Sequence, residues 1–141
     1  MKEFSPEEIK TGVIECVSQS LATSPTSVTI ESRLLSDLNA DSLDFMDIMF
    51  SLEQKFGIRL QKEDFNLLSK MGVNQATDTV GGVLSVGAKE KLQYVLPMLP
   101  IEETIAIKDL GSFISVETLI ILVTDLLKDL KLRAVTPGHK I

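Results

Sequence analysis

The chain has 141 residues and is 44% hydrophobic, so it is long enough for one domain with a packed core and too short to favour two independent domains. The formal net charge of −6 is uneven, since residues 1–65 carry 12 acidic and 6 basic residues and residues 66–141 carry 8 of each. This acidity argues against nucleic-acid binding, which needs basic side chains, and fits either a basic protein partner or a role in solubility alone.

Cysteine content and hydrophobicity argue against several further classes of protein. Cys16 is the only cysteine, so this chain alone offers no disulfide framework and no cysteine-based metal site. The N-terminus lacks the apolar run of a secretory signal, and the longest apolar stretch near the C-terminus is interrupted by Glu117 and Asp125. We therefore expect a soluble, cytoplasmic protein with no membrane insertion.

The first expected helix covers residues 6–21. Ser5 provides an N-cap, Pro6 suits the first helical position, and Glu8 can complete a capping box. Residues 22–40 are rich in serine and threonine and indicate a long loop. Five apolar side chains of this loop are expected to reach the core: Val28, Ile30, Leu34, Leu35 and Leu38.

A second helix is expected to start at Asp41 or Ser42 and to run to about Phe56, before Gly57. Residues 58–71 have room for a short third helix. Residues 72–88 contain four glycines and no sustained periodicity, which predicts an irregular connector with a turn at the Gly81-Gly82 pair.

Ser85 is a candidate cap for a further short helix, which Pro97 and Pro100 would end. The last helix is expected at residues 115–132. Ile121 and Leu122 lie outside its apolar stripe, so this helix needs cover on two sides.

The final residues, 134–141, are expected to form a flexible tail. His139, the only histidine, lies in this tail and is more consistent with a solvated residue than with a ligand. No segment shows a clear strand pattern, so the predicted fold class is all-α.

The second helix has two contrasting faces. At about 100° per residue, one arc is expected to face the core and contains Phe45, Ile48, Met49, Leu52 and Phe56. The opposite arc places three large apolar residues beside two acids: Leu43, Met46 and Phe50 with Asp44 and Asp47. Exposed apolar side chains ringed by carboxylates indicate a docking surface for a partner with a basic rim. In the alternative, residues 66–104 fold back over this arc.

Ser42 is a poor candidate for a catalytic nucleophile. A nucleophilic serine needs a base that is itself oriented by a third group, and His139 lies far away in the expected tail. The position of Ser42 at a helix start instead suits either simple helix capping or modification by another enzyme.

The stretch "LLSDLNADSLDFMDIMFSLEQKFGIRLQKEDF", residues 34–65, resembles the acyl carrier protein family. It contains an Asp-Ser-Leu attachment motif after an Asp-Leu-x-Ala segment, and then Leu-Glu-x-x-Phe and Ile-x-Leu-x-x-x-Asp patterns. The resemblance covers residues 6–65 and resumes at 104–113. It implies an acyl-carrier-like helix bundle with a four-helix type core, formed by a single domain over residues 1–141. Residues 66–103 would then be an insertion with an additional helix.

By this resemblance, a phosphopantetheinyl transferase attaches 4′-phosphopantetheine to Ser42, and acyl groups are carried as thioesters on its thiol. Asp41 and Leu43 complete the attachment motif. The protein would be a carrier and not an enzyme. The resemblance also implies partners with basic docking patches: the transferase and the acyl-loading, acyl-transfer or condensing enzymes. The matching partner-binding positions are Asp44, Met46, Asp47 and Phe50.

Several alternatives stay open from the sequence. The pathway can be a specialised fatty-acid, lipid or secondary-metabolite pathway, and the cargo can equally be peptidyl or polyketide. A different class of protein is a helical interaction module in which Ser42 is never modified and only caps its helix. The insertion either covers the apolar last helix and reshapes a cavity for the acyl chain or only completes the core.

Overall fold

The computed structural model describes residues 3–60 and 66–135. The main helices are α1 (Pro6–Ser20), α2 (Ser42–Phe56), α5 (Val86–Leu92) and α6 (Val116–Val135). Two single-turn helices, α3 (Leu67–Lys70) and α4 (Gln75–Asp78), precede a hairpin of β1 (Thr79–Val80) and β2 (Val83–Leu84). Two 3-10 helices, η1 (Pro25–Ser27) and η3 (Ile107–Phe113), lie in the connections. The mostly helical fold confirms the predicted class.

The ends of α1 and α2 follow from their sequences. Ser5 and Glu8 form a complete capping box at the start of α1, as predicted. Helix α2 ends at Gly57, whose left-handed conformation (φ 66°) is one that glycine adopts without steric cost. Both helices therefore begin and end within one residue of their predicted bounds.

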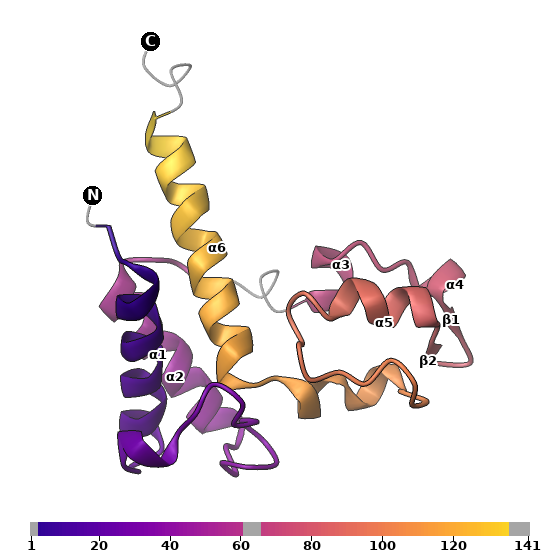
Figure 1. Cartoon of the computed structure of the whole chain (residues 1–141), viewed down its shortest axis with the longest axis horizontal. Coiled ribbons are helices and arrows are strands. Elements are labelled where there is room, and N and C mark those ends of the chain that lie inside the picture. The colour runs from indigo at the N-terminus through magenta and orange to yellow at the C-terminus, as the bar shows by residue number, and fades with distance from the viewer. Residues whose placement is uncertain (1–2, 61–65, 136–141) are drawn as a thin grey trace.

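The first core is formed by α1, α2 and α6, which lie together on the left of Figure 1. Helix α1 packs against both of the other helices. The core side of α2 is the predicted one, because Ile48, Leu52 and Phe56 are buried and Phe45 and Met49 are half-buried. Phe4 and Phe56 make an edge-to-face contact with ring centroids 4.9 Å apart.

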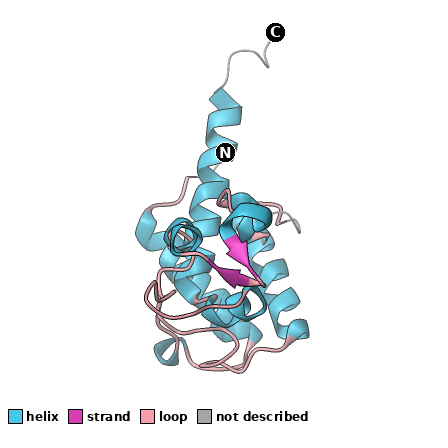
Figure 2. Cartoon of the chain, turned by 90° about the vertical axis from the view of Figure 1, so that its right-hand side faces the viewer, coloured by secondary structure: helices cyan, strands magenta, loops and turns pink. Residues whose placement is uncertain are grey.

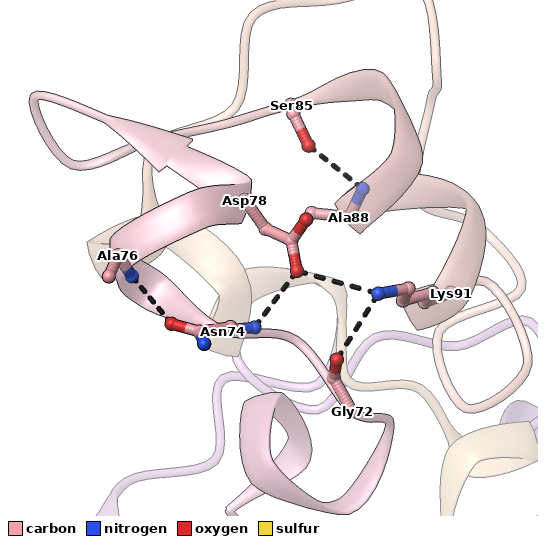
Figure 3. Close-up of polar contacts among 7 residues, drawn as sticks. All are labelled: Gly72, Asn74, Ala76, Asp78, Ser85, Ala88 and Lys91. Atoms are coloured by element: carbon pink, nitrogen blue, oxygen red, sulfur yellow. Dashed lines mark hydrogen bonds and ion pairs between the residues drawn. The ribbon is translucent and has the colours of Figure 1, made fainter.

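Residues 66–103, here called the middle segment, build a second core on the right of Figure 1. It contains α3, α4, α5 and the hairpin. Its largest fully buried side chains include Leu92, Leu96 and Leu99. Ser85 caps α5 by accepting a hydrogen bond from the backbone N–H of Ala88 at 3.0 Å, as predicted. The amine of Lys91 in α5 contacts the carboxylate of Asp78 at the end of α4 and donates to the carbonyl of Gly72 before α4 (Figure 3).

Helix α6 contributes to both cores. Val116, Leu119 and Val123 are buried in the first core, and Leu122 is buried in the second, with Ile121 packed against it. Tyr94 of the middle segment also donates a hydrogen bond to Asp125 of α6 at 3.1 Å. The prediction that this helix needs cover on two sides is confirmed. Beyond the two cores, α6 extends past the body of the molecule (Figures 1 and 2).

Four details of the sequence-based expectations were wrong. Leu35 does not reach the core and is 47% exposed. Helix α5 ends at Leu92, well before Pro97, so proline is not what ends it. The connector also holds an antiparallel hairpin, whose Gly81-Gly82 turn has positive φ at both residues. Two-residue strands are too short to give an alternating pattern.

The fourth detail concerns the chain end. Helix α6 continues to Val135, so residues 134 and 135 are helical and not part of a tail. The rest of the expected tail, including His139, lies outside the described residues. Within the residues that the structure describes, no helix is long and apolar enough to cross a membrane.

Gly12 is expected to be required where α1 meets α2. A Cβ added at Gly12 would lie 2.6 Å from Cζ of the buried Phe56. For Gly12→Ala we expect a net loss of about 1 kcal/mol in the free energy of unfolding, because overpacking costs about 1–3 kcal/mol and the gain in helix propensity returns about 1 kcal/mol. Urea unfolding measures the difference.

Gly87→Ala is the matched control. A Cβ at Gly87 of α5 would meet only Ser85 Oγ, at 3.9 Å, so this variant should be as stable as the parent or more stable. Equal effects of the two substitutions would contradict the packing argument for Gly12.

Candidate functional site

The candidate site is the N-terminus of α2. Asp41 is the N-cap, because its carboxylate accepts a hydrogen bond from the backbone N–H of Asp44 at 2.8 Å. The carboxylate of Asp44 in turn accepts from the backbone N–H of Asp41 at 3.1 Å, which completes a capping box. Ser42 is the first helical residue and is exposed. Its hydroxyl has no hydrogen-bond partner within residues 3–60 and 66–135.

The chain before α2 sets the direction of the helix. Asn39 adopts a left-handed conformation (φ 54°), which asparagine tolerates better than most residues. Ala40 is buried, and its backbone N–H donates to the carbonyl of Leu34 at 2.9 Å. The backbone N–H of Leu34 donates to the carbonyl of Ile114 at 3.0 Å. These bonds connect the start of α2 to the segment before α6.

The outer face of α2 is uncovered. Leu43, Met46 and Phe50 are 74%, 66% and 60% exposed. The alternative in which residues 66–104 fold back over this face is therefore wrong; the described part of that segment packs against η3 and α6 instead. Large exposed apolar side chains on a monomeric chain mark interaction surfaces.

The acids of this face divide into two kinds. Asp41 and Asp44 are both engaged in the capping box, and Asp44 is half-buried. Asp47 is exposed. In the described ranges, no lysine or arginine forms a salt bridge with any of the three. Their negative charge is therefore open to a basic partner.

An open groove lies beside Ser42, with a volume of about 390 Å³. Asp41 and Ser42 are its polar lining residues, at one side. The other lining residues are mostly apolar and come from the preceding loop, from α2 and from the segment before α6: Leu34, Leu35, Phe45, Met46, Gly111 and Ile114. Such a groove can shelter an apolar chain attached near Ser42.

Among the described residues, no group of three or more histidine, cysteine or acidic side chains is placed to hold a metal ion. Cys16 is buried, and this burial raises the pKa of its thiol, which makes it a poor nucleophile.

The start of α2 and its exposed face were predicted from the sequence, but the capping box of Asp41 and Asp44 and the opposite side of the groove were missed. Gly111 and Ile114 line the groove from the segment before α6. The resemblance at residues 104–113 was the only signal there, and it carried no information about which side chains face α2. Glu53 was also missed: its carboxylate accepts from the backbone N–H of Leu60 at 2.8 Å, which fixes the chain after α2.

Comparison with known proteins adds an independent line of evidence. Residues 11–70 match the family model described as the phosphopantetheine attachment site. An acyl carrier protein of Thermotoga maritima is 37% identical over 68 residues, which are 48% of this chain and 84% of that protein. Acyl carrier proteins of Renibacterium salmoninarum (34% over 68 residues, 48% and 84%) and an Exiguobacterium species (36% over 69 residues, 49% and 87%) are also similar. No solved structure is significantly similar to the chain.

These matches agree with the helical fold and with an acidic, exposed serine helix. The family model identifies 4′-phosphopantetheine as the group that is attached, so this chain is a carrier and not a catalytic enzyme. The chain belongs to the acyl carrier protein family.

Proposed function

We propose that Ser42 is the residue to which 4′-phosphopantetheine is attached. The main support is that the Ser42 hydroxyl is exposed and has no hydrogen bond in the described structure, at the start of α2. Asp41 fulfils the capping role, so the serine is not needed to satisfy the backbone N–H groups of the helix. A transferase can therefore modify Ser42 without disrupting the cap.

The surroundings of Ser42 fit a phosphodiester with a long arm. The N-terminus of the 15-residue helix α2 carries a partial positive charge, which stabilises an anion attached at Ser42. The carboxylates of Asp41 and Asp44 each accept a hydrogen bond from the backbone N–H of the other residue, so part of their negative charge is already compensated near the attachment point. When bound, the arm supplies a thiol that carries acyl groups as thioesters.

The groove beside Ser42 suits an apolar cargo. Leu34, Phe45 and Ile114 line it with side chains that cannot hydrogen-bond. Each methylene group removed from water contributes about 0.8 kcal/mol, so even partial entry of an acyl chain is favourable.

The exposed face of α2 is the proposed surface for partner enzymes. Leu43, Met46 and Phe50 provide apolar contact area, and Asp44 and Asp47 provide negative charge. A partner with an apolar hollow and a basic rim would complement both features. We propose the phosphopantetheinyl transferase and acyl-loading, acyl-transfer or condensing enzymes as these partners.

We propose that the chain is a single carrier domain into which residues 66–103 are inserted, serving a specialised fatty-acid, lipid or secondary-metabolite pathway. The second core is the observation that favours specialisation, because it gives α6 a cover that the first core does not provide. A peptidyl or polyketide cargo would use the same serine and is the alternative.

Intact mass spectrometry tests the attachment site. Incubation with coenzyme A and a broad-specificity phosphopantetheinyl transferase should add one phosphopantetheinyl group to the parent chain. Ser42→Ala should abolish the addition, because its methyl group offers no oxygen for attachment. Ser36→Ala, which removes another exposed hydroxyl close by in the sequence, should leave it unchanged. Addition to the Ser42→Ala variant would contradict the proposal.

The partner face is tested by the rate of this modification. Combining Asp47→Lys with Phe50→Ala removes a charge contact and an apolar contact but touches neither Ser42 nor the groove. We expect the rate at low protein concentration to fall by about tenfold or more. Rising ionic strength should slow the parent chain more than the variant.

The matched control for charge is Glu102→Lys with Phe50 intact. Glu102 is exposed and lies outside α2, and the substitution changes the net charge as much as Asp47→Lys does. If the control slows modification as much as the double variant, the face of α2 is not the docking surface.

A capping measurement separates a carrier from an interaction module in which Ser42 only caps its helix. Asp41→Ala should lower the free energy of unfolding by about 1 kcal/mol, because the N-cap hydrogen bond is lost. Ser42→Ala should change it by less than about 0.5 kcal/mol. Urea unfolding of both variants measures the difference, and a larger loss for Ser42→Ala than for Asp41→Ala would support the module instead.

A further inference from the structure

The groove beside Ser42 is formed by two segments that the middle segment separates in the sequence. One side is α2 and the loop before it, and the other side contains Gly111 of η3 and Ile114. No lining residue comes from the described part of the middle segment. The second side nevertheless depends on the middle segment, as the contacts of η3 indicate.

The chain leading into η3, residues 103–107, is held by three hydrogen bonds from α5 and the hairpin. The amine of Lys89, a residue only 5% exposed, donates to the carbonyl of Glu103 at 2.6 Å. The backbone N–H of Leu84 donates to the carbonyl of Ile105 at 2.9 Å, and the N–H of Ile107 donates to the carbonyl of Gly82 at 2.8 Å. Helix α5 and the hairpin therefore fix the start of η3.

The chain leaving η3 is held by the loop before α2. The backbone N–H of Leu34 donates to the carbonyl of Ile114, and the N–H of Val116 donates to the carbonyl of Ser32 at 2.9 Å. The guanidinium of Arg33 lies over the ring of Phe113, 4.9 Å from its centroid. Both ends of η3 are thus attached, each to a different part of the molecule.

The inner side of η3 is packed as well. Leu110 and Phe113 are buried in the second core together with the large side chains of the middle segment. Ile114 packs against both cores. Close-packed interiors resist changes in volume, so η3 cannot move away from α2 without disturbing the second core.

We propose that the middle segment is a positioning element for the carried acyl group. By fixing η3, it holds Gly111 and Ile114 at a set distance from α2 and so limits the size of cargo that the groove accepts. The cargo class is therefore acyl groups that fit the groove of about 390 Å³, and chains longer than the groove project into solvent. This inference rests on the proposed attachment of the arm to Ser42.

The test uses a matched pair of lysines on α5. Lys89→Met removes the hydrogen bond to Glu103 while retaining an apolar side chain of similar length. Lys91→Met is the control, because the Lys91 amine contacts Gly72 and Asp78, which precede α5, and within the described ranges no hydrogen bond or ion pair joins it to the chain leading into η3 (Figure 3). Neither lysine lines the groove or belongs to the face of α2.

Each chain is loaded with 4′-phosphopantetheine arms that carry saturated acyl groups of increasing length, and the midpoint of thermal unfolding is measured. The midpoint of the parent chain should rise with acyl length and then level off when the groove is full. For Lys89→Met it should level off at a longer acyl group, and amide exchange over residues 107–113 should rise about tenfold or more. Lys91→Met should behave as the parent does.

A merely structural role for Lys89 would lower all midpoints equally without moving the length at which they level off, and that result overturns the inference. So does a parent chain whose midpoint is independent of acyl length. Failure of the parent chain to accept the arm at Ser42 is a different outcome, because it removes the proposed function itself.

A second pair of variants covers the case in which Lys89→Met unfolds the middle segment. Gly82→Val places a β-branched residue at φ 80° in the hairpin turn, and Gly81→Asn keeps the turn because asparagine tolerates positive φ. Neither added Cβ would meet another atom within 4 Å. Gly82→Val should shift the levelling-off length and Gly81→Asn should not, and equal behaviour of the two overturns the inference.

Discussion

The last helix, α6, carries apolar side chains on two sides, and the arrangement of the rest of the chain follows from the need to cover both. Helices α1 and α2 cover one side, where Val116, Leu119 and Val123 are buried. The middle segment covers the other, where Leu122 is buried. Removing a buried leucine side chain typically costs about 2–5 kcal/mol, so leaving either side open would consume a large part of the stability of a single domain.

This double cover has a consequence for the site. Because the middle segment is occupied in covering α6 and η3, it leaves the outer face of α2 free, and Leu43, Met46 and Phe50 stay exposed. The chain therefore combines a covered last helix with an uncovered, partly apolar face on α2. The acids near Ser42 also differ in their contacts, since Asp41 and Asp44 form the capping box, whereas Asp47 is exposed and takes no part in it.

The sequence was informative wherever a local pattern determines the structure. The capping box at Ser5, the end of α2 at Gly57 and the two faces of α2 each depend on residues within a turn or two of one another. The capping box of Asp41 and Asp44 is equally local but was not predicted. The two-sided apolarity of α6 was also visible, because it is a property of one helix. Family resemblance then supplied the serine, which the local pattern alone left ambiguous between a cap and an attachment site.

The sequence was uninformative where distant segments meet. Leu35 was expected in the core with the other apolar side chains of its loop, but it is 47% exposed and lies at the groove beside Gly111, whereas Leu34 is buried. The contact of Lys89 with Glu103 joins residues far apart in the chain and could not be read from spacing. Helix α5 also ends at Leu92, before any proline, although the residues that follow it, including Val95 and Leu96, are buried.

The central claim is that Ser42, and no other serine of its neighbourhood, carries the arm. Cleavage after Arg33 and Lys55 releases residues 34–55 as one peptide, which contains Ser36, Ser42 and Ser51. Fragment-ion mass spectrometry of this peptide from the modified protein can assign the attached group to one of the three. The account predicts that the mass increment begins at Ser42, and an increment on Ser36 or Ser51 would contradict it.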